Sequence, residues 1–120
     1  MKLEKIVHVS DLQDRKPLRL KGEGYNLCLV LSENQVYAFL NRCPHTGARM
    51  DGGRVRRNVV TCVHHLAQFD LRTGEVLTFP MEGLNPEDTG PLTLFRVEID
   101  DGWITVDTDV AVGRAAGDDR

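Results

Sequence analysis

Two short segments of this 120-residue chain combine cysteine with histidine at spacings suited to metal binding. The first is Cys43-Pro44-His45 and the second is Cys62-Val63-His64-His65. Each segment supplies a thiolate and an imidazole, and both kinds of ligand bind transition metals. Only one of the two adjacent histidines can complete the second pair. We expect it to be His65, which forms Cys-x-x-His, while His64 shields or presents the site.

Two thiolates and two imidazoles can hold either of two metal centres. Such a set can bind a single Zn²⁺ tetrahedrally, and it is also the ligand set in which two Cys hold one iron and two His the other iron of a [2Fe–2S] cluster. Familiar zinc sites take both thiolates from one segment and both imidazoles from another. Here each segment gives one of each, which favours two similar loops gripping a two-iron cluster from opposite sides.

The stretch from Arg42 to Asp70 resembles the Rieske [2Fe–2S] domain. The matching residues are Cys43, Pro44 and His45 in the first loop, and in the second Cys62 and His65, followed by Phe69, Asp70 and the turn Thr73-Gly74-Glu75. The resemblance covers most of residues 2–107 in length and layout. It implies a small β protein that is not itself an enzyme and carries single electrons on one [2Fe–2S] cluster per chain. The cluster ligands that it implies are Cys43, His45, Cys62 and His65, the general ligation of this class of centre.

Charge and composition exclude several classes of protein. The net charge of −3 gives no reason to expect nucleic-acid binding. No apolar run approaches the roughly 18 residues of a membrane span, and the alternating, charged start is not a signal peptide. With two of the three cysteines assigned to metal and Cys28 inside an apolar run, no disulfide framework remains. This cysteine usage fits a reducing cytoplasm, and we expect a cytoplasmic monomer.

The elements around the two segments read as β-strands joined by tight turns. Alternating or apolar runs bounded by turn residues predict strands at residues 3–9, 18–21, 25–31, 36–40, 59–61, 68–71, 76–79, 92–99 and 103–106. We therefore expect an all-β fold: a Rieske-like antiparallel β-sandwich base, made from the first four and last two strands, with a small cluster-binding subdomain inserted at about residues 42–80. Residues 1–107 form a single domain in this interpretation, and residues 108–120 form a flexible tail.

Within the family, the loop residues imply a low reduction potential. High-potential members carry an extra disulfide at the positions of Ala48 and His64, and Ser and Tyr hydroxyls at the positions of Ala67 and Phe69. The side chains present here cannot donate hydrogen bonds to the cluster sulfurs, so they stabilise the reduced state less. We expect a potential near the low end of the range of this class, about −150 mV.

A low-potential carrier suits a multicomponent oxygenase system, where it passes electrons from an NAD(P)H-dependent flavin reductase to a terminal oxygenase. The chain has no G-x-G-x-x-G fingerprint of its own and no 2-His-1-carboxylate set. The segment 83–88 resembles the ferredoxins of toluene-type systems, which favours a diiron monooxygenase partner over a ring-hydroxylating dioxygenase. The alternatives are a structural zinc module or a small reductase subunit that uses the same loops.

The arginines near the ligand segments form a possible docking rim. They are Arg42, Arg49, Arg54, Arg56 and Arg57, and between residues 42 and 57 only Asp51 opposes them. Such a rim would steer the chain toward an acidic partner face at low salt. The alternative is a scattered, solvated surface.

Overall fold

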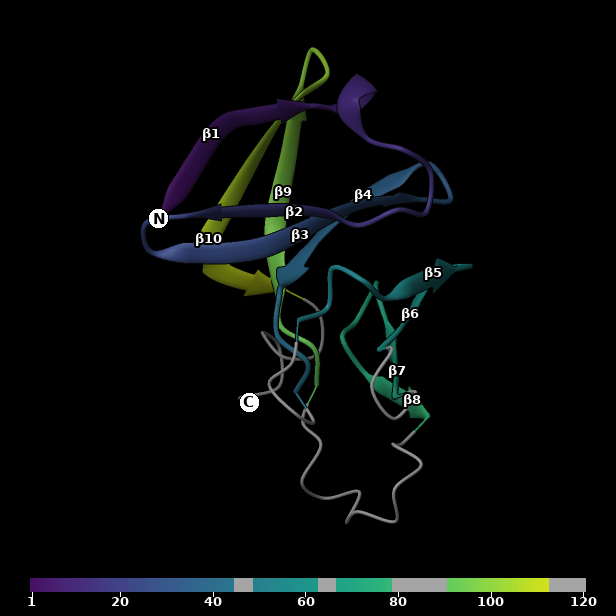
Figure 1. Ribbon diagram of the computed structural model, residues 1–120. Coiled ribbons are helices and arrows are strands. Elements are labelled where there is room, and N and C mark those ends of the chain that lie inside the picture. The colour runs from purple at the N-terminus through teal and green to yellow at the C-terminus, as the bar shows by residue number, and fades with distance from the viewer. Residues whose placement is uncertain (45–48, 63–66, 79–90, 113–120) are drawn as a thin grey trace.

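The fold consists of two antiparallel β-sheets (Figure 1) in a computed structural model that describes residues 1–44, 49–62, 67–78 and 91–112. The larger sheet has the strand order β1-β10-β9-β4-β3-β2. Its strands are β1 (Lys2–His8), β2 (Leu18–Gly22), β3 (Tyr25–Ser32), β4 (Gln35–Leu40), β9 (Leu94–Asp100) and β10 (Trp103–Val112), and a short 3₁₀ turn, η1 (Val9–Asp11), follows β1. The smaller sheet has the order β5-β6-β7-β8, with β5 (Arg54–Arg56), β6 (Val59–Thr61), β7 (Gln68–Asp70) and β8 (Val76–Thr78).

Tight two-residue turns set the register of the hairpins. Glu33 and Asn34, between β3 and β4, have φ values of 51° and 65°, and Arg57 and Asn58, between β5 and β6, have 50° and 65°. Two consecutive residues with positive φ are the signature of the type I′ turn, whose twist matches that of the strands it joins. These turns therefore set the positions of β4 and β6, the strands that end just before Cys43 and Cys62.

The apolar run of β3 is explained by burial on both faces. Leu27 and Leu29 join one core cluster inside the larger sheet, together with Ala38, Ile104 and Val106. The alternate residues, Cys28 and Val30, join a second cluster with side chains of the smaller sheet. Because successive side chains of a strand point to opposite faces, β3 serves both cores and holds the smaller sheet against the base.

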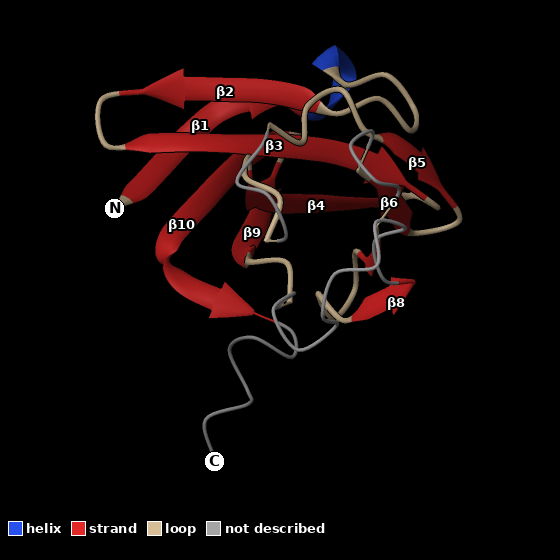
Figure 2. Cartoon of the chain, turned by 60° about the horizontal axis from the view of Figure 1, so that its bottom comes forward, coloured by secondary structure: helices blue, strands red, loops and turns tan. Residues whose placement is uncertain are grey.

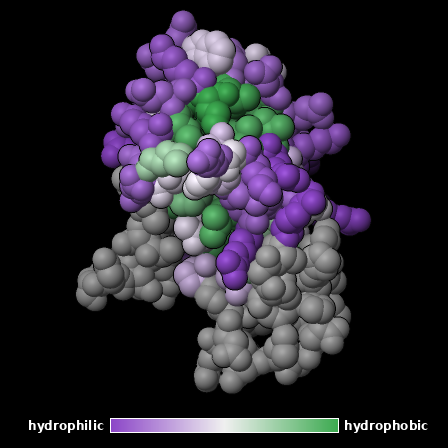
Figure 3. All heavy atoms as spheres, turned by 60° about the vertical axis from the view of Figure 1, so that its left-hand side comes forward, coloured by the Kyte–Doolittle hydropathy of each residue, from purple (hydrophilic) through white to green (hydrophobic). Residues whose placement is uncertain are grey.

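The predicted class is confirmed: the described fold is all-β and antiparallel, with six base strands and a smaller sheet inserted between β4 and β9. Figure 2 shows this separation from below, and Figure 3 shows that hydrophilic side chains cover much of one face, with a limited apolar group between them. No helix in the described parts of the chain is long and apolar enough to span a membrane.

The largest differences from the sequence expectation are one strand that was missed and one strand that ends later than predicted. The strand β5 was not predicted, because its three residues contain a single apolar side chain, Val55, between two turns. The last strand continues to Val112, beyond the predicted end at Val106, since an irregularity between Asp107 and Ala111 restores pairing with Phe95 and Leu94. Residues 108–112 of the predicted flexible tail therefore belong to β10, and the predicted start of the tail at residue 108 is wrong. Residues 113–120 lie outside the described residues, so a flexible tail over that range stays a prediction.

Candidate metal centre

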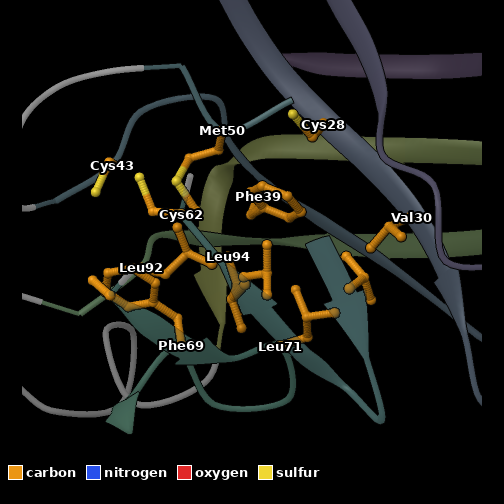
Figure 4. Close-up of a cluster of buried hydrophobic side chains, with 13 residues drawn as sticks. Cys28, Val30, Phe39, Cys43, Met50, Cys62, Phe69, Leu71, Leu92 and Leu94 are labelled. Atoms are coloured by element: carbon orange, nitrogen blue, oxygen red, sulfur yellow. The ribbon is translucent and has the colours of Figure 1, made fainter. Parts of the chain in front are cut away.

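Cys43 and Cys62, two of the four predicted ligands, come together in the buried cluster between the sheets. Their exposed fractions are 1% and 0%, and neither forms a disulfide. Cys43 lies three residues beyond β4 and Cys62 directly follows β6, so the two hairpins bring them to the same end of the cluster (Figure 4). Cys28 lies apart from them, on β3.

The chemistry of this environment fits a metal centre. The side chains that share the cluster with the two cysteines are apolar, among them Met50, Phe69 and Leu92. A thiolate in such surroundings is stable only if a cation lies beside it, and metal binding supplies that cation. In the same cluster, burial raises the pKa of Cys28 to about 12 and keeps it a neutral thiol.

The first loop, residues 43–50, is closed by a single buried amide. The Asn41 side chain, 4% exposed, accepts hydrogen bonds through Oδ1 from the backbone N–H of Met50 at 2.6 Å and of Asp51 at 2.9 Å. Its Nδ2 donates to Asn26 Oδ1 at 3.1 Å and to Asp51 Oδ1 at 3.2 Å. We call this set of four bonds the Asn41 clamp. It fixes Asn41, two residues before Cys43, to Met50 and Asp51 at the other end of the loop.

An ion pair reinforces the clamp. Arg49 donates to Asp51 through Nε at 2.9 Å and through a terminal guanidinium nitrogen at 2.8 Å. Chiefly because of the hydrogen bonds from Arg49, which outweigh burial, the pKa of Asp51 lies far below its usual range. A depressed pKa means that this stabilisation is present above about pH 4 and is lost only as the pH falls through the depressed value.

The second loop, residues 62–67, is closed by the backbone. The N–H of Cys62 donates to the carbonyl oxygen of Ala67 at 2.8 Å, which extends the pairing of β6 with β7 by one step. Beside this bond the Gln68 side chain donates to Thr61 Oγ1 at 3.2 Å. The two described ends of the loop, Cys62 and Ala67, therefore continue the β6–β7 hairpin.

Gly53 lies where the two loops meet. A Cβ at this position would stand 2.8 Å from the carbonyl oxygen of Thr61 and 3.1 Å from that of Met50. The chain returning from the first loop can pass this close to β6 only because residue 53 has no side chain.

The far end of the smaller sheet is tied to the base by a turn after β7. Asp70 accepts from the Arg72 backbone N–H at 2.8 Å and from the Arg72 guanidinium at 3.2 Å. Burial raises the pKa of Asp70, but the hydrogen bonds and charge of Arg72 outweigh it and lower the pKa overall. Gly74 then accepts from the Leu92 N–H at 2.8 Å, which links the turn to the irregular segment that leads into β9.

The structure describes two of the four predicted ligands. Cys43 and Cys62 lie in one buried cluster, while His45, His64 and His65 lie outside the described residues, so the binding of metal by all of these residues stays a prediction. The sequence interpretation missed Asn41 and did not see why Gly53 is needed. A polar residue after an apolar strand looks like an ordinary turn residue, and only the contacts between residues nine and ten positions apart identify the clamp.

This chain is similar in sequence and in fold to known iron–sulfur proteins. The family model described as "Rieske [2Fe-2S] domain" matches residues 2–88. The chain is 35% identical over 75 residues to the naphthalene 1,2-dioxygenase system ferredoxin component of Pseudomonas putida, which is 62% of this chain and 72% of that protein. It is 31% identical over 100 residues to the 3-phenylpropionate/cinnamic acid dioxygenase ferredoxin subunit of Escherichia coli, which is 82% of this chain and 87% of that protein. A chain in the solved complex of reduced oxygenase and oxidized ferredoxin in carbazole 1,9a-dioxygenase superposes with a TM-score of 0.72 at 27% identity, covering 88% of this chain and 90% of that one.

Proposed function

Because this chain belongs to the Rieske [2Fe–2S] domain family, we propose that it carries single electrons from an NAD(P)H-dependent flavin reductase to a terminal oxygenase. The family implies one [2Fe–2S] cluster per chain, and the relatives are ferredoxin components of dioxygenase systems and not their catalytic subunits. The observation that carries the proposal is the burial of Cys43 and Cys62 in one apolar cluster at the end of two hairpins.

Four residues would hold the cluster. The two buried cysteines would bind one iron, and His45 and His65 would bind the other, in the ligation typical of this class. When bound, the cluster supplies a one-electron redox couple. The chain's own part is to exclude water from the thiolates with Met50, Phe69 and Leu92 and to fix the loops with the Asn41 clamp and the Cys62–Ala67 bond.

The oxygenase partner is the finer part of the proposal. The relatives named above serve naphthalene and phenylpropionate dioxygenases, and the solved complex joins a ferredoxin to an oxygenase of carbazole 1,9a-dioxygenase. These names favour a ring-hydroxylating dioxygenase partner. The sequence preference for a diiron monooxygenase rests on residues 83–88, which lie outside the described residues, and it finds no support among these relatives. A monomeric state and a cytoplasmic location also stay predictions.

Electron transfer between purified proteins tests the proposal. The holoprotein should contain iron and acid-labile sulfide, take up one electron reversibly, and give the paramagnetic signal of a mixed Cys/His cluster. Reduced protein is then mixed with an oxidised ring-hydroxylating dioxygenase and, separately, with an oxidised diiron hydroxylase, and re-oxidation is followed by visible absorption. Faster re-oxidation by the dioxygenase supports the preferred partner. Colourless protein that holds zinc would instead support a structural zinc module and overturn the proposal.

A further inference from the structure

A groove of about 880 Å³ runs along the outer face of the smaller sheet. In β5, Val55 points into the core, so Arg54 and Arg56 on either side of it point outward into the groove. The opposite wall is the connection between η1 and β2, which contributes Arg15 and Lys16. Figures 1 and 2 both place this connection beside β5.

The groove is strongly basic. Its lining includes five cations, which are Arg15, Lys16, Arg54, Arg56 and Arg57, and one acid, Asp51. Asp51 is already engaged by Arg49. Of the five cations, only Arg15 pairs with a described acidic residue, the exposed Asp14 at 3.2 Å. Within the part of the chain that the structure describes, four like charges therefore face one groove without an acidic partner, in a chain whose net charge is −3. Such an arrangement attracts an anionic partner.

Both walls are fixed to the base, so the groove is preformed. The Arg15 N–H donates to the carbonyl oxygen of Leu31 at 2.7 Å, which holds the connection against the end of β3. On the other side, the Asn58 N–H donates to the Ser32 hydroxyl at 3.2 Å, which holds the β5–β6 turn. A surface whose shape is already set loses less conformational entropy when a partner binds.

The floor of the groove favours a protein as the occupant. Val59 and Leu77 line it, and Leu77 is 49% exposed. Apolar floor residues among arginines suit a segment that carries carboxylates beside apolar side chains, because guanidinium groups bind carboxylates with two parallel hydrogen bonds. At its other end the groove reaches Thr61 and Gln68, the residues that flank the second loop. An occupant would therefore lie beside the redox end of the molecule.

We propose that this basic groove docks an acidic, extended protein segment of a redox partner. The inference deepens the proposed function and rests on it. It also sharpens the docking rim expected from the sequence: Arg54, Arg56 and Arg57 line the groove, Arg42 and Arg49 do not, and Arg15 and Lys16 join from a distant part of the chain.

A charge-reversed pair of variants tests the groove. Holoprotein with Arg54→Glu and Arg56→Glu is compared with holoprotein carrying Arg19→Glu and Lys21→Glu, two exposed cations at alternate positions of the edge strand β2. Both variants change the net charge equally. The probe is a labelled, end-blocked peptide of alternating glutamates and leucines, and binding is measured by fluorescence anisotropy at ionic strengths of roughly 0.02 M and 0.15 M.

The proposal expects salt-sensitive binding to the wild type, at least tenfold weaker binding to the groove variant, and nearly unchanged binding to the β2 variant. Equal weakening in both variants would reduce the effect to net charge and overturn the proposal, as would absence of binding to the wild type. Tighter binding of a single-stranded oligonucleotide, lost in the groove variant, would assign the groove to another polyanion and also overturn it. Visible and paramagnetic spectra check that each variant keeps its cluster. If the wild type itself lacked these spectra, the proposed electron-carrier function would be wrong. The peptide-binding measurement is independent of that result.

Discussion

The two loops that carry the cysteines are held by different kinds of bond. The first loop is closed by a side chain, since the amide of Asn41 bonds the backbone of Met50 and Asp51. The second is closed by the backbone, through the bond from Cys62 to Ala67 that extends a hairpin. A backbone bond survives most substitutions, whereas a side-chain bond depends on one residue. We therefore expect substitutions of the side chains that close the first loop to weaken retention of the metal centre, and substitutions beside the second loop to affect it less.

Removal of a predicted cysteine ligand should have the same effect in either loop. We predict that Cys43→Ala and Cys62→Ala each abolish the visible absorption, iron and acid-labile sulfide of the purified protein, because either change leaves one iron with a single thiolate. Cys28→Ala is the matched control, since it removes a buried thiol of the same cluster of side chains. It should keep the full metal content and lose about 1 kcal/mol of stability. A Cys62→Ala protein that retains its cluster would remove the second loop from the site.

Removal of a side-chain hydrogen bond should destabilise the first loop more than the second. Asn41→Leu keeps the approximate volume but leaves the N–H groups of Met50 and Asp51 without their buried acceptor. At about 1–3 kcal/mol for each of the two unsatisfied groups, we expect the free energy of unfolding to fall by about 2–6 kcal/mol. Gln68→Leu removes the tie to Thr61 in the second loop, where the Cys62–Ala67 bond remains. It should cost less than about 1 kcal/mol.

Urea titrations followed by visible absorption measure both effects on the holoprotein. The single tryptophan, Trp103 in β10, reports in the same titration on the base sheet. Asn41→Leu should move the absorption change to lower urea more than the fluorescence change. Equal losses in the two leucine variants would show that the kind of bond is irrelevant and would end the comparison.

Two adjacent glycines test the junction of the loops. Gly53→Ala places a methyl group 2.8 Å from the Thr61 carbonyl oxygen, so strands or loop must move apart. We predict a loss of about 1–3 kcal/mol. At Gly52 an added methyl group meets nothing within 4 Å, and Gly52→Ala should stay within about 0.5 kcal/mol of the wild type. Thermal denaturation of both holoproteins measures the difference, and a destabilised Gly52→Ala protein with an unaffected Gly53→Ala protein would contradict the close approach.

The sequence predicted the hairpins and the convergence of the cysteines because both follow from local signals. In the turn pairs Glu33-Asn34 and Asp101-Gly102 all four residues have positive φ angles, which Asn, Asp and Gly tolerate better than other residue types. Alternation, by contrast, could not find β5, which has one apolar residue, and could not divide the run of β3 between two cores.

Local sequence signals could not predict the contacts of the site between residues that are distant in the sequence. The clamp depends on where the Asn41 side chain points, and the need for Gly53 depends on how close Thr61 passes. The basic groove is similar, because Arg15 and Arg54 are far apart in sequence and meet only when the β1–β2 connection folds beside β5. Local patterns predict which residues carry charge or bind metal, but the contacts that position them come from tertiary structure.

The smallest predicted effect concerns the end of the second loop and the strand β7 that follows it, where substitutions should change the redox potential while the cluster is retained. Ala67 and Phe69 are fully buried in the same cluster as the cysteines, and neither side chain can donate a hydrogen bond. Ala67→Ser and Phe69→Tyr each add one hydroxyl, and a hydroxyl that donates to a cluster sulfur stabilises the more negative, reduced state. Taking about 1 kcal/mol for one such bond, we expect each change to raise the potential by roughly 40 mV for a one-electron couple, starting from a wild-type value near −150 mV. Voltammetry measures the shift, with Gly52→Ala as a neutral control. A wild-type potential well above zero, or equal shifts in the control, would show that these two positions do not set the potential.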